Sequence, residues 1–201
     1  MVAVSDAPPP DVDGDGYADV VIGAPLYNDG SDIGGRVTVY LGGHAGLATA
    51  PDFTEDGGQT SALFGSSVGT AGDVNGDGYS DVIIGSPLYD GGDTEEGAAF
   101  LYLGSAAGPA LVPDWMTEGD QQDAYHGHSV CTAGDVNGDG FDDVLVAAKV
   151  GEGLPDIPEL LESGAVELVV NTTAGRRAAL DAGSIRRAAL DARELYITTI
   201  P

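Results

Sequence analysis

A short acidic motif with the residue types of a hard-metal site occurs three times in the chain. It has aspartate at positions 1, 5 and 9, aspartate or asparagine at position 3, and glycine at position 6. In a tight loop, the side-chain oxygens of positions 1, 3 and 5 can converge on one point. Position 7 can add its backbone carbonyl and position 9 a further carboxylate. Since Ca²⁺ takes about six to eight such oxygens, each copy predicts a calcium-binding loop.

Glycine and charge set the properties of these copies, which we number loop 1, loop 2 and loop 3 along the chain. Glycine at position 6 permits a sharp turn with positive φ. Without a cation, the gathered carboxylates would repel one another, so we expect calcium binding to be coupled to folding. The predicted ligands are Asp11, Asp13, Asp15, the Tyr17 carbonyl and Asp19 in loop 1; Asp73, Asn75, Asp77, the Tyr79 carbonyl and Asp81 in loop 2; and Asp135, Asn137, Asp139, the Phe141 carbonyl and Asp143 in loop 3.

Two other interpretations of the motif are weaker. An EF-hand or a dockerin-like loop needs glutamate at position 12 and helices on both sides, whereas position 12 is Ile22, Ile84 and Val146, each inside a β-like run. A plain acidic surface turn does not explain why the same spacing occurs three times in one register. The sequence therefore favours calcium loops that are followed by strands.

The loops belong to a longer repeat, because their first aspartates, Asp11, Asp73 and Asp135, are 62 residues apart each time. Short apolar runs follow every loop, at 20–22, 82–84 and 144–146, and are typical of inner, doubly buried strands. Residues 36–41 alternate as a half-buried strand does, 99–103 and 166–170 occupy the matching places, and a weaker strand is expected near 114–117. A unit of about four strands is the size of a propeller blade, and such units must stack to bury their faces.

The segments Phe64-Gly65, Gly72–Asp81 and Gly85-Ser86-Pro87 resemble the FG-GAP repeat of integrin α-subunit propellers and of many bacterial surface proteins, and Gly23-Ala24-Pro25 gives the GAP signature literally. The resemblance covers roughly residues 11–170. It implies a β-propeller of bacterial type with calcium in the loop between the first two strands of each blade. It also implies that the opposite, upper face contacts ligand, as in integrins.

The chain departs from the family pattern in three ways. It has three repeats, whereas family propellers usually close with seven blades. The first repeat has Ala7-Pro8-Pro9-Pro10 before its loop, and the third has His126-Gly127 in place of Phe-Gly and Ala147-Ala148-Lys149 in place of GAP. We therefore expect an all-β open arc or partial propeller. Its repeats span 1–62, 63–124 and 125–175, and a tail at 176–201 completes the last blade or leads into a lost domain.

The amino-acid composition limits the classes of partner and the cellular locations that fit this chain. The chain has 33 acidic and 7 basic residues, a net charge of −26, which disfavours nucleic acid and anionic membrane surfaces. No apolar run reaches the ~18 residues of a membrane span, so we expect no membrane insertion. One cysteine excludes an internal disulfide framework. The start of the chain does not read as a signal peptide, and an extracellular or cell-surface location follows from the family resemblance.

The motifs of catalytic type in this chain are weak evidence for an enzyme. Gly65-Ser66-Ser67-Val68-Gly69 matches a nucleophile elbow but lacks the strand–turn–helix context that this motif requires. His126, His128 and Cys131 could form a soft-metal site, although two of them occupy core positions of the repeat. Pairs of carboxylates suited to glycoside hydrolysis are already assigned to the calcium loops. We therefore predict no enzymatic activity.

The predicted function is extracellular binding or adhesion, in which calcium makes the blades rigid and other loops present themselves to a protein or glycan ligand. The candidate presenting segments are 28–33, 90–96 and 151–162. The main alternative is a non-catalytic structural spacer beside a catalytic domain in a longer exported protein, and a weaker one is an enzyme acting on polysaccharide. Open blade edges also predict self-association.

Overall fold

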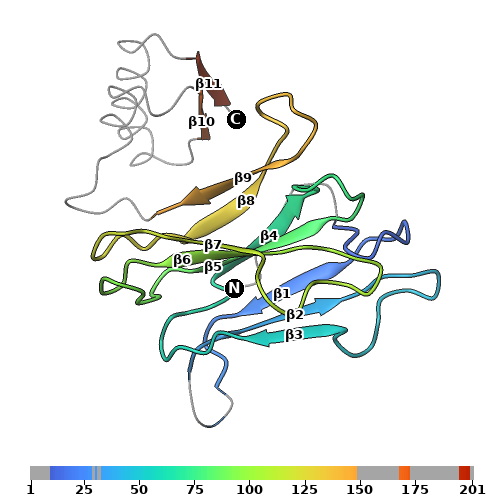
Figure 1. Ribbon diagram of the computed structural model, residues 1–201, viewed down its shortest axis with the longest axis horizontal. Coiled ribbons are helices and arrows are strands. Elements are labelled where there is room, and N and C mark those ends of the chain that lie inside the picture. Colours follow the sequence, from blue (N-terminus) through green and yellow to red (C-terminus); the bar gives the residue numbers. More distant parts are fainter. Residues whose placement is uncertain (1–9, 29, 31–32, 149–167, 173–194, 200–201) are drawn as a thin grey trace. The chain divides into compact units, whose positions relative to one another are not determined.

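The computed structural model describes residues 10–28, 30, 33–148, 168–172 and 195–199. The chain divides into two compact units, residues 1–149 and 150–201. In the described residues of the first unit, the strands form three antiparallel sheets that succeed one another along the chain (Figure 1). No helix in the described ranges is both long enough and apolar enough to cross a membrane.

The second sheet is a complete four-stranded blade. Its strands follow one another as an antiparallel meander, so that chain order and sheet order are the same. They are β4 (Ser67–Gly72), β5 (Asp81–Ser86), β6 (Ala98–Tyr102) and β7 (Trp115–Glu118). Because neighbouring strands are antiparallel, the β4–β5 connection lies at one end of the blade and the β5–β6 connection at the other.

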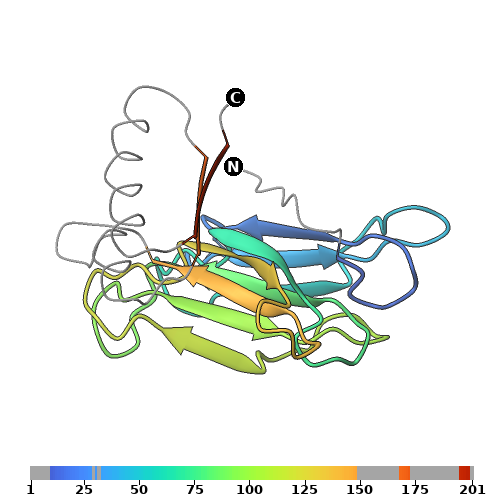
Figure 2. The same ribbon diagram turned by 90° about the horizontal axis from the view of Figure 1, so that it is seen from above.

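Each of the two flanking sheets matches a part of this four-stranded blade in the repeat. The first has β1 (Val20–Ala24), β2 (Arg36–Tyr40) and β3 (Phe53–Asp56), which match β5, β6 and β7 in the repeat. The third has β8 (Ser129–Gly134) and β9 (Asp143–Ala147), which match β4 and β5. The middle sheet lies between the other two in Figure 1, and the three sheets overlap when they are seen from above (Figure 2). The all-β class, the repeated blades and the open arrangement predicted from the sequence are thereby confirmed in the described residues.

The second unit contains two described strands, β10 (Leu168–Thr172) and β11 (Leu195–Thr199), which pair in parallel. The tail predicted at 176–201 therefore contains one described strand. The strand expected at 166–170 is seen at 168–172, but it pairs with β11 and not as the third strand of a blade. The arginine pairs of the tail, at 176–177 and 186–187, lie outside the described residues, and the boundaries of repeats and tail stay predictions.

The hydrophobic core lies between successive sheets. On one face of β5, Val82 and Ile84 join a cluster that includes Val37 and Val39 of β2. On the other face, Ile83 packs in a second cluster that reaches Val130 of β8 and three further residues, Ala71, Ala99 and Leu101. The alternation of side chains along β5 therefore joins three sheets into one stack.

Double burial of the apolar runs was predicted for all three repeats, and it holds fully for the middle one. Ile83 is 0% exposed, whereas its counterpart in the third repeat, Leu145, is 50% exposed, and Val20 in the first repeat is 38% exposed. The prediction is wrong for these outer positions because β5 has a described sheet on both faces, whereas β1 and β9 each have one.

Truncation of Ile83 tests this stacking, with Leu145 at the same repeat position as the matched control. Ile83→Ala should lower the free energy of unfolding by about 2–5 kcal/mol, since it leaves a cavity between two sheets. Leu145→Ala should cost about 0.5 kcal/mol, since half of that side chain is exposed. Urea unfolding followed by circular dichroism measures both. Equal losses would show that the sheets do not stack as described.

Candidate metal centres

The three acidic loops lie at equivalent places in the fold. Loop 2 joins β4 to β5 and loop 3 joins β8 to β9, while loop 1 leads directly into β1. In both complete connections a register shift in the strand pairing ends the first strand, at Thr70/Gly72 and at Thr132/Gly134. Gly72 and Gly134 have φ values of 79° and 70°, a conformation that glycine adopts without strain. The sequence thus folds each loop as a sharp turn at the same end of its blade.

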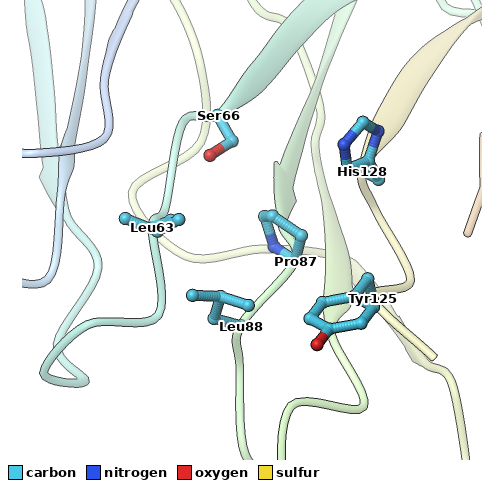
Figure 3. A pocket seen from close by; sticks show the side chains of 6 residues that line it. All are labelled: Leu63, Ser66, Pro87, Leu88, Tyr125 and His128. Atoms are coloured by element: carbon cyan, nitrogen blue, oxygen red, sulfur yellow. The ribbon is translucent and has the colours of Figure 1, made fainter. Parts of the chain in front are cut away.

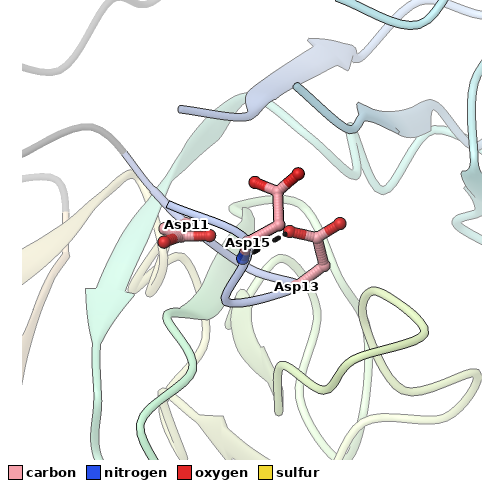
Figure 4. Close-up of side chains that lie close together, drawn as sticks. All are labelled: Asp11, Asp13 and Asp15. Atoms are coloured by element: carbon pink, nitrogen blue, oxygen red, sulfur yellow. Dashed lines mark hydrogen bonds between the residues drawn. The ribbon is translucent and has the colours of Figure 1, made fainter. Parts of the chain in front are cut away.

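Loop 1 brings three carboxylates together. One oxygen each of Asp11, Asp13 and Asp15 lies within 4.8 Å of the others, and Figure 4 shows the three side chains around the turn. The Asp15 N–H donates to Asp13 Oδ1 at 3.2 Å. Asp11 Oδ1 is buried and has no hydrogen-bond partner among the described residues. A buried oxygen that lacks a partner is costly, and a cation held by the three carboxylates would satisfy it.

The same hydrogen bonds shape all three loops. The carboxylate at position 1 accepts the N–H of the position-6 glycine at 3.0, 2.9 and 3.0 Å in loops 1, 2 and 3. The side chain at position 3 accepts the N–H of position 5, and that at position 5 accepts the N–H of position 7. These bonds turn the side chains inward over the backbone, so that their remaining oxygen lone pairs can face a cation.

The ligand set differs between the loops at position 3. Loop 1 has Asp13 there, whereas loops 2 and 3 have Asn75 and Asn137. The Asn75 Nδ2 donates to Asp77 Oδ2 at 2.9 Å. Loops 2 and 3 therefore gather two carboxylates and one amide at positions 1, 3 and 5, which lowers the like-charge repulsion in them. The carbonyls at position 7 stay predicted ligands.

The carboxylate at position 9 has a structural role that the sequence did not reveal. Asp81 is fully buried, and it accepts the N–H of Val74 and the N–H of Gly104, both at 2.8 Å. Asp19 does the same with Val12 at 2.6 Å and Gly42 at 2.7 Å. This residue therefore ties the start of its loop to the strand connection 23 residues further along. In loop 3, the counterpart accepts the N–H of Val136 at 2.9 Å.

Burial also shifts the pKa values of the position-9 carboxylates in loops 1 and 2. Burial raises the pKa of Asp19 and of Asp81, and the two backbone N–H groups bound to each oppose that rise. Nearby carboxylates of the same loop raise the pKa values further. A bound cation would remove this repulsion. The direct coordination of a cation by position 9 stays a prediction.

A second acidic cluster, which the sequence analysis missed, consists of Glu96, Glu118 and Asp120. Glu96 is 1% exposed, and its Oε1 accepts the N–H groups of Gly91, Gly92 and Asp93 at 2.6, 2.5 and 3.3 Å. These donors, with Gly92 the strongest, hold the pKa of Glu96 below its ordinary value. Its carboxylate therefore anchors the β5–β6 loop. In the sequence, the only signal for this role is that Glu96 closely follows Gly91, Gly92 and Asp93.

A pocket of about 350 Å³ lies at the opposite end of the blades from the acidic loops. It is formed by the connections β3–β4, β5–β6 and β7–β8 (Figure 3). The Tyr125 hydroxyl donates to Glu95 Oε2 at 3.0 Å beside it. Its lining residues are Leu63, Ser66, Pro87, Leu88, Tyr125 and His128.

The residues of the other motifs lie outside the two groups of candidate metal ligands in the described residues. Ser67 begins β4, and its Oγ donates to the carbonyl of Gly127 at 2.8 Å, so it links two neighbouring blades. In the described part of the chain, His126, His128 and Cys131 join neither group of candidate metal ligands. His126 Nε2 is buried without a partner there, and burial lowers the pKa of the imidazole.

Comparisons with known proteins find the same repeats. A family model described as "FG-GAP repeat" matches residues 4–40, 64–102 and 126–154, together more than half of the chain. Integrin alpha-5 of Xenopus laevis is 35% identical over 147 residues, and integrin alpha-PS2 of Drosophila melanogaster is 34% identical over 151. Integrin alpha-7 of Homo sapiens is 34% identical over 148 residues. Each alignment covers 69% of this chain but 14%, 11% and 11% of the relative, respectively.

Replacement of Asp81 by asparagine separates the structural role of position 9 from cation binding. In EDTA, Asp81→Asn should lower the free energy of unfolding by about 2 kcal/mol, since an amide group would oppose one of the two backbone donors. Asp77→Asn is the control, because Asp77 is exposed and its replacement relieves repulsion without cation. Chemical unfolding in EDTA measures both variants. A loss for Asp77→Asn as large as for Asp81→Asn would contradict the assignment.

Replacement of His126 by phenylalanine, the residue at the equivalent position 64, tests the buried imidazole. Because the pKa of His126 is lowered in the folded state, the wild-type protein should lose stability as the pH falls from about 6.5. The variant should lack this part of the pH dependence and be more stable by about 1 kcal/mol at pH 7. Thermal unfolding between pH 5 and 8 provides the comparison. Parallel pH profiles for the two proteins would refute the role of His126.

Proposed function

The chain belongs to the FG-GAP repeat family, and from this premise we propose that it is a calcium-stabilised propeller module that binds a protein or glycan ligand outside the cell. Its repeats are like those of integrin alpha chains. The calcium, the ligand and the extracellular location are parts of the proposal.

The observation that carries the calcium proposal is the set of oxygens in loop 1. Three carboxylates converge there, and one buried oxygen of Asp11 has no partner among the described residues. All the side chains at positions 1, 3, 5 and 9 offer oxygen, and none offers sulfur or imidazole. Hard cations such as Ca²⁺ prefer this donor set, whereas Zn²⁺ and copper favour nitrogen or sulfur.

We propose one Ca²⁺ in each loop, held by positions 1, 3, 5, 7 and 9 as predicted from the spacing. The ion would cross-link the end of one strand to the beginning of the next, across the turn that joins them. It would also neutralise the charge that the turn concentrates. The proposed consequence is that the end of each blade that carries the acidic loop becomes rigid. A rigid blade would keep the connections at its other end in fixed positions.

The connections at the end of the blades opposite the acidic loops support a role in binding. All the non-glycine residues with positive φ in the described chain lie in the β3–β4, β5–β6 and β7–β8 connections, and two of them, Leu63 and Tyr125, line the pocket. Backbone held in this conformation is often found where a ligand is recognised. Of the proposed presenting segments, 90–96 is described, 28–33 is described in part and 151–162 lies outside the described residues. The residues with positive φ are Ser61, Leu63, Glu95, Asp120, Asp123 and Tyr125.

Calcium titration tests the proposed metal role. Addition of Ca²⁺ after EDTA treatment should raise the melting temperature, because each site adds about 2.7 kcal/mol of stability at a free concentration of ~100 Kd. Isothermal calorimetry should give three ions per chain. Dissociation constants of about 0.1–1 mM would suit an extracellular module.

The control is the triple variant Asp15→Asn, Asp77→Asn and Asp139→Asn, which changes the exposed position-5 residue of every loop. It should be at least as stable as the wild-type protein in EDTA, since it relieves repulsion between carboxylates, and it should lose the response to Ca²⁺. A folded wild-type protein whose melting temperature does not change with Ca²⁺ would reject the proposal.

A further inference from the structure

The three loops contact one another from blade to blade, and we propose that they bind calcium as a coupled row. In this row, each loop holds the first ligand residue of the preceding loop in place. The inference rests on the proposed calcium binding. It adds that the affinity of a loop depends on its neighbour, and it assigns the residues at positions 7 and 8 as positioning residues.

Loop 2 holds loop 1 through two contacts. The N–H of Ser80, at position 8, donates to the backbone carbonyl of Asp11 at 2.9 Å. The ring of Tyr79, at position 7, lies against Gly14, at position 4 of loop 1. A Cβ atom on Gly14 would come within 2.8 Å of Tyr79 Cε1, so the ring can take this place because position 4 is glycine. Both contacts fix the turn that carries the first aspartate.

Loop 3 holds loop 2 in the same way and with one more bond. The N–H of Asp142 donates to the carbonyl of Asp73 at 3.0 Å, and its Oδ2 accepts the Asp73 N–H at 2.9 Å. The ring of Phe141 lies against Gly76, where a Cβ would be 2.6 Å from its Cε1. The same positions thus make the same contacts at both junctions, which shows that they are a property of the repeat.

These contacts connect the ordering of one site to the ordering of the next. A loop that is fixed by its cation offers a fixed ring and a fixed N–H to the preceding loop, which then loses less conformational entropy when it binds its own cation. Thermodynamic linkage makes the effect reciprocal, so an occupied loop 1 also favours loop 2. Calcium should therefore bind the loops with positive cooperativity.

Each end of the row lacks one of these contacts in the described chain. Tyr17 has the position of Tyr79 in loop 1, but its side chain is 44% exposed and no position-4 glycine of the described chain lies against it. At the other end, nothing lies within 4 Å of a Cβ placed on Gly138, at position 4 of loop 3. Loop 3 lacks this support in the described chain and should have the lowest affinity.

Glycine amides can report on each loop separately. In protein labelled with ¹⁵N-glycine, the N–H groups of Gly16, Gly78 and Gly140 donate to the three position-1 carboxylates, and their NMR shifts give one calcium midpoint per loop. Tyr79→Ala should raise the midpoint of loop 1 at least about five-fold, the lower range of measured couplings. Tyr27→Ala removes a tyrosine ring that lies outside the three loops, and it should leave that midpoint within about two-fold.

A second variant keeps the ring and removes the neighbouring charge. Asp77→Asn should weaken calcium binding in loop 2 and raise the midpoint of loop 1 as well. If Tyr79→Ala does not give the dispersed NMR spectrum of a folded protein, Asp77→Asn alone decides whether loop 1 and loop 2 are coupled.

The outcomes separate the coupling from calcium binding itself. If no glycine amide of the wild-type protein shows a saturable shift, the proposed calcium function fails and the coupling fails with it. If all three saturate and the loop 1 midpoint is unchanged in folded Tyr79→Ala and in Asp77→Asn, calcium binding stands and the coupling is overturned.

Discussion

Repulsion between aspartates that a tight turn brings together is the constraint on which the rest of this structure depends. Two unit charges at 4.8 Å, the separation within which the loop 1 oxygens gather, repel by about 3 kcal/mol at an effective dielectric constant of ~20. Backbone N–H groups at positions 5, 6 and 7 offset part of this cost. Asp11 Oδ1, which has no hydrogen-bond partner among the described residues, marks what these donors leave unsatisfied. The proposed cation would be its partner.

The topology of the blade places the loops that are proposed to stabilise it and the pocket at opposite ends. Since β4, β5, β6 and β7 form a meander, the acidic loops lie at one end of the sheets and the pocket at the other. Stacking of successive sheets buries β5 on both faces, and the contacts between loops continue that stack at its lower end. A change in the loops can therefore alter rigidity without altering the residues that line the pocket.

Much of this arrangement could be predicted from the sequence, because it depends on local spacing repeated three times. The positions of the loops, the strands that follow them and the family were all accessible in this way. The second role of Asp81 was not, because its partner Gly104 is distant in the chain. The exposure of Leu145 was missed because repeat alignment treats all blades alike, whereas burial depends on which neighbours are present. The anchor at Glu96 depends on loop geometry that has no repeated signature.

The most direct test of the central claim is the anomalous difference density of calcium in crystals grown with Ca²⁺. The account predicts one peak in each loop, surrounded by the oxygens of positions 1, 3, 5, 7 and 9, including the Oδ1 of Asp11. Well-ordered loops without a peak, or calcium bound elsewhere while the loops keep these hydrogen bonds, would contradict it.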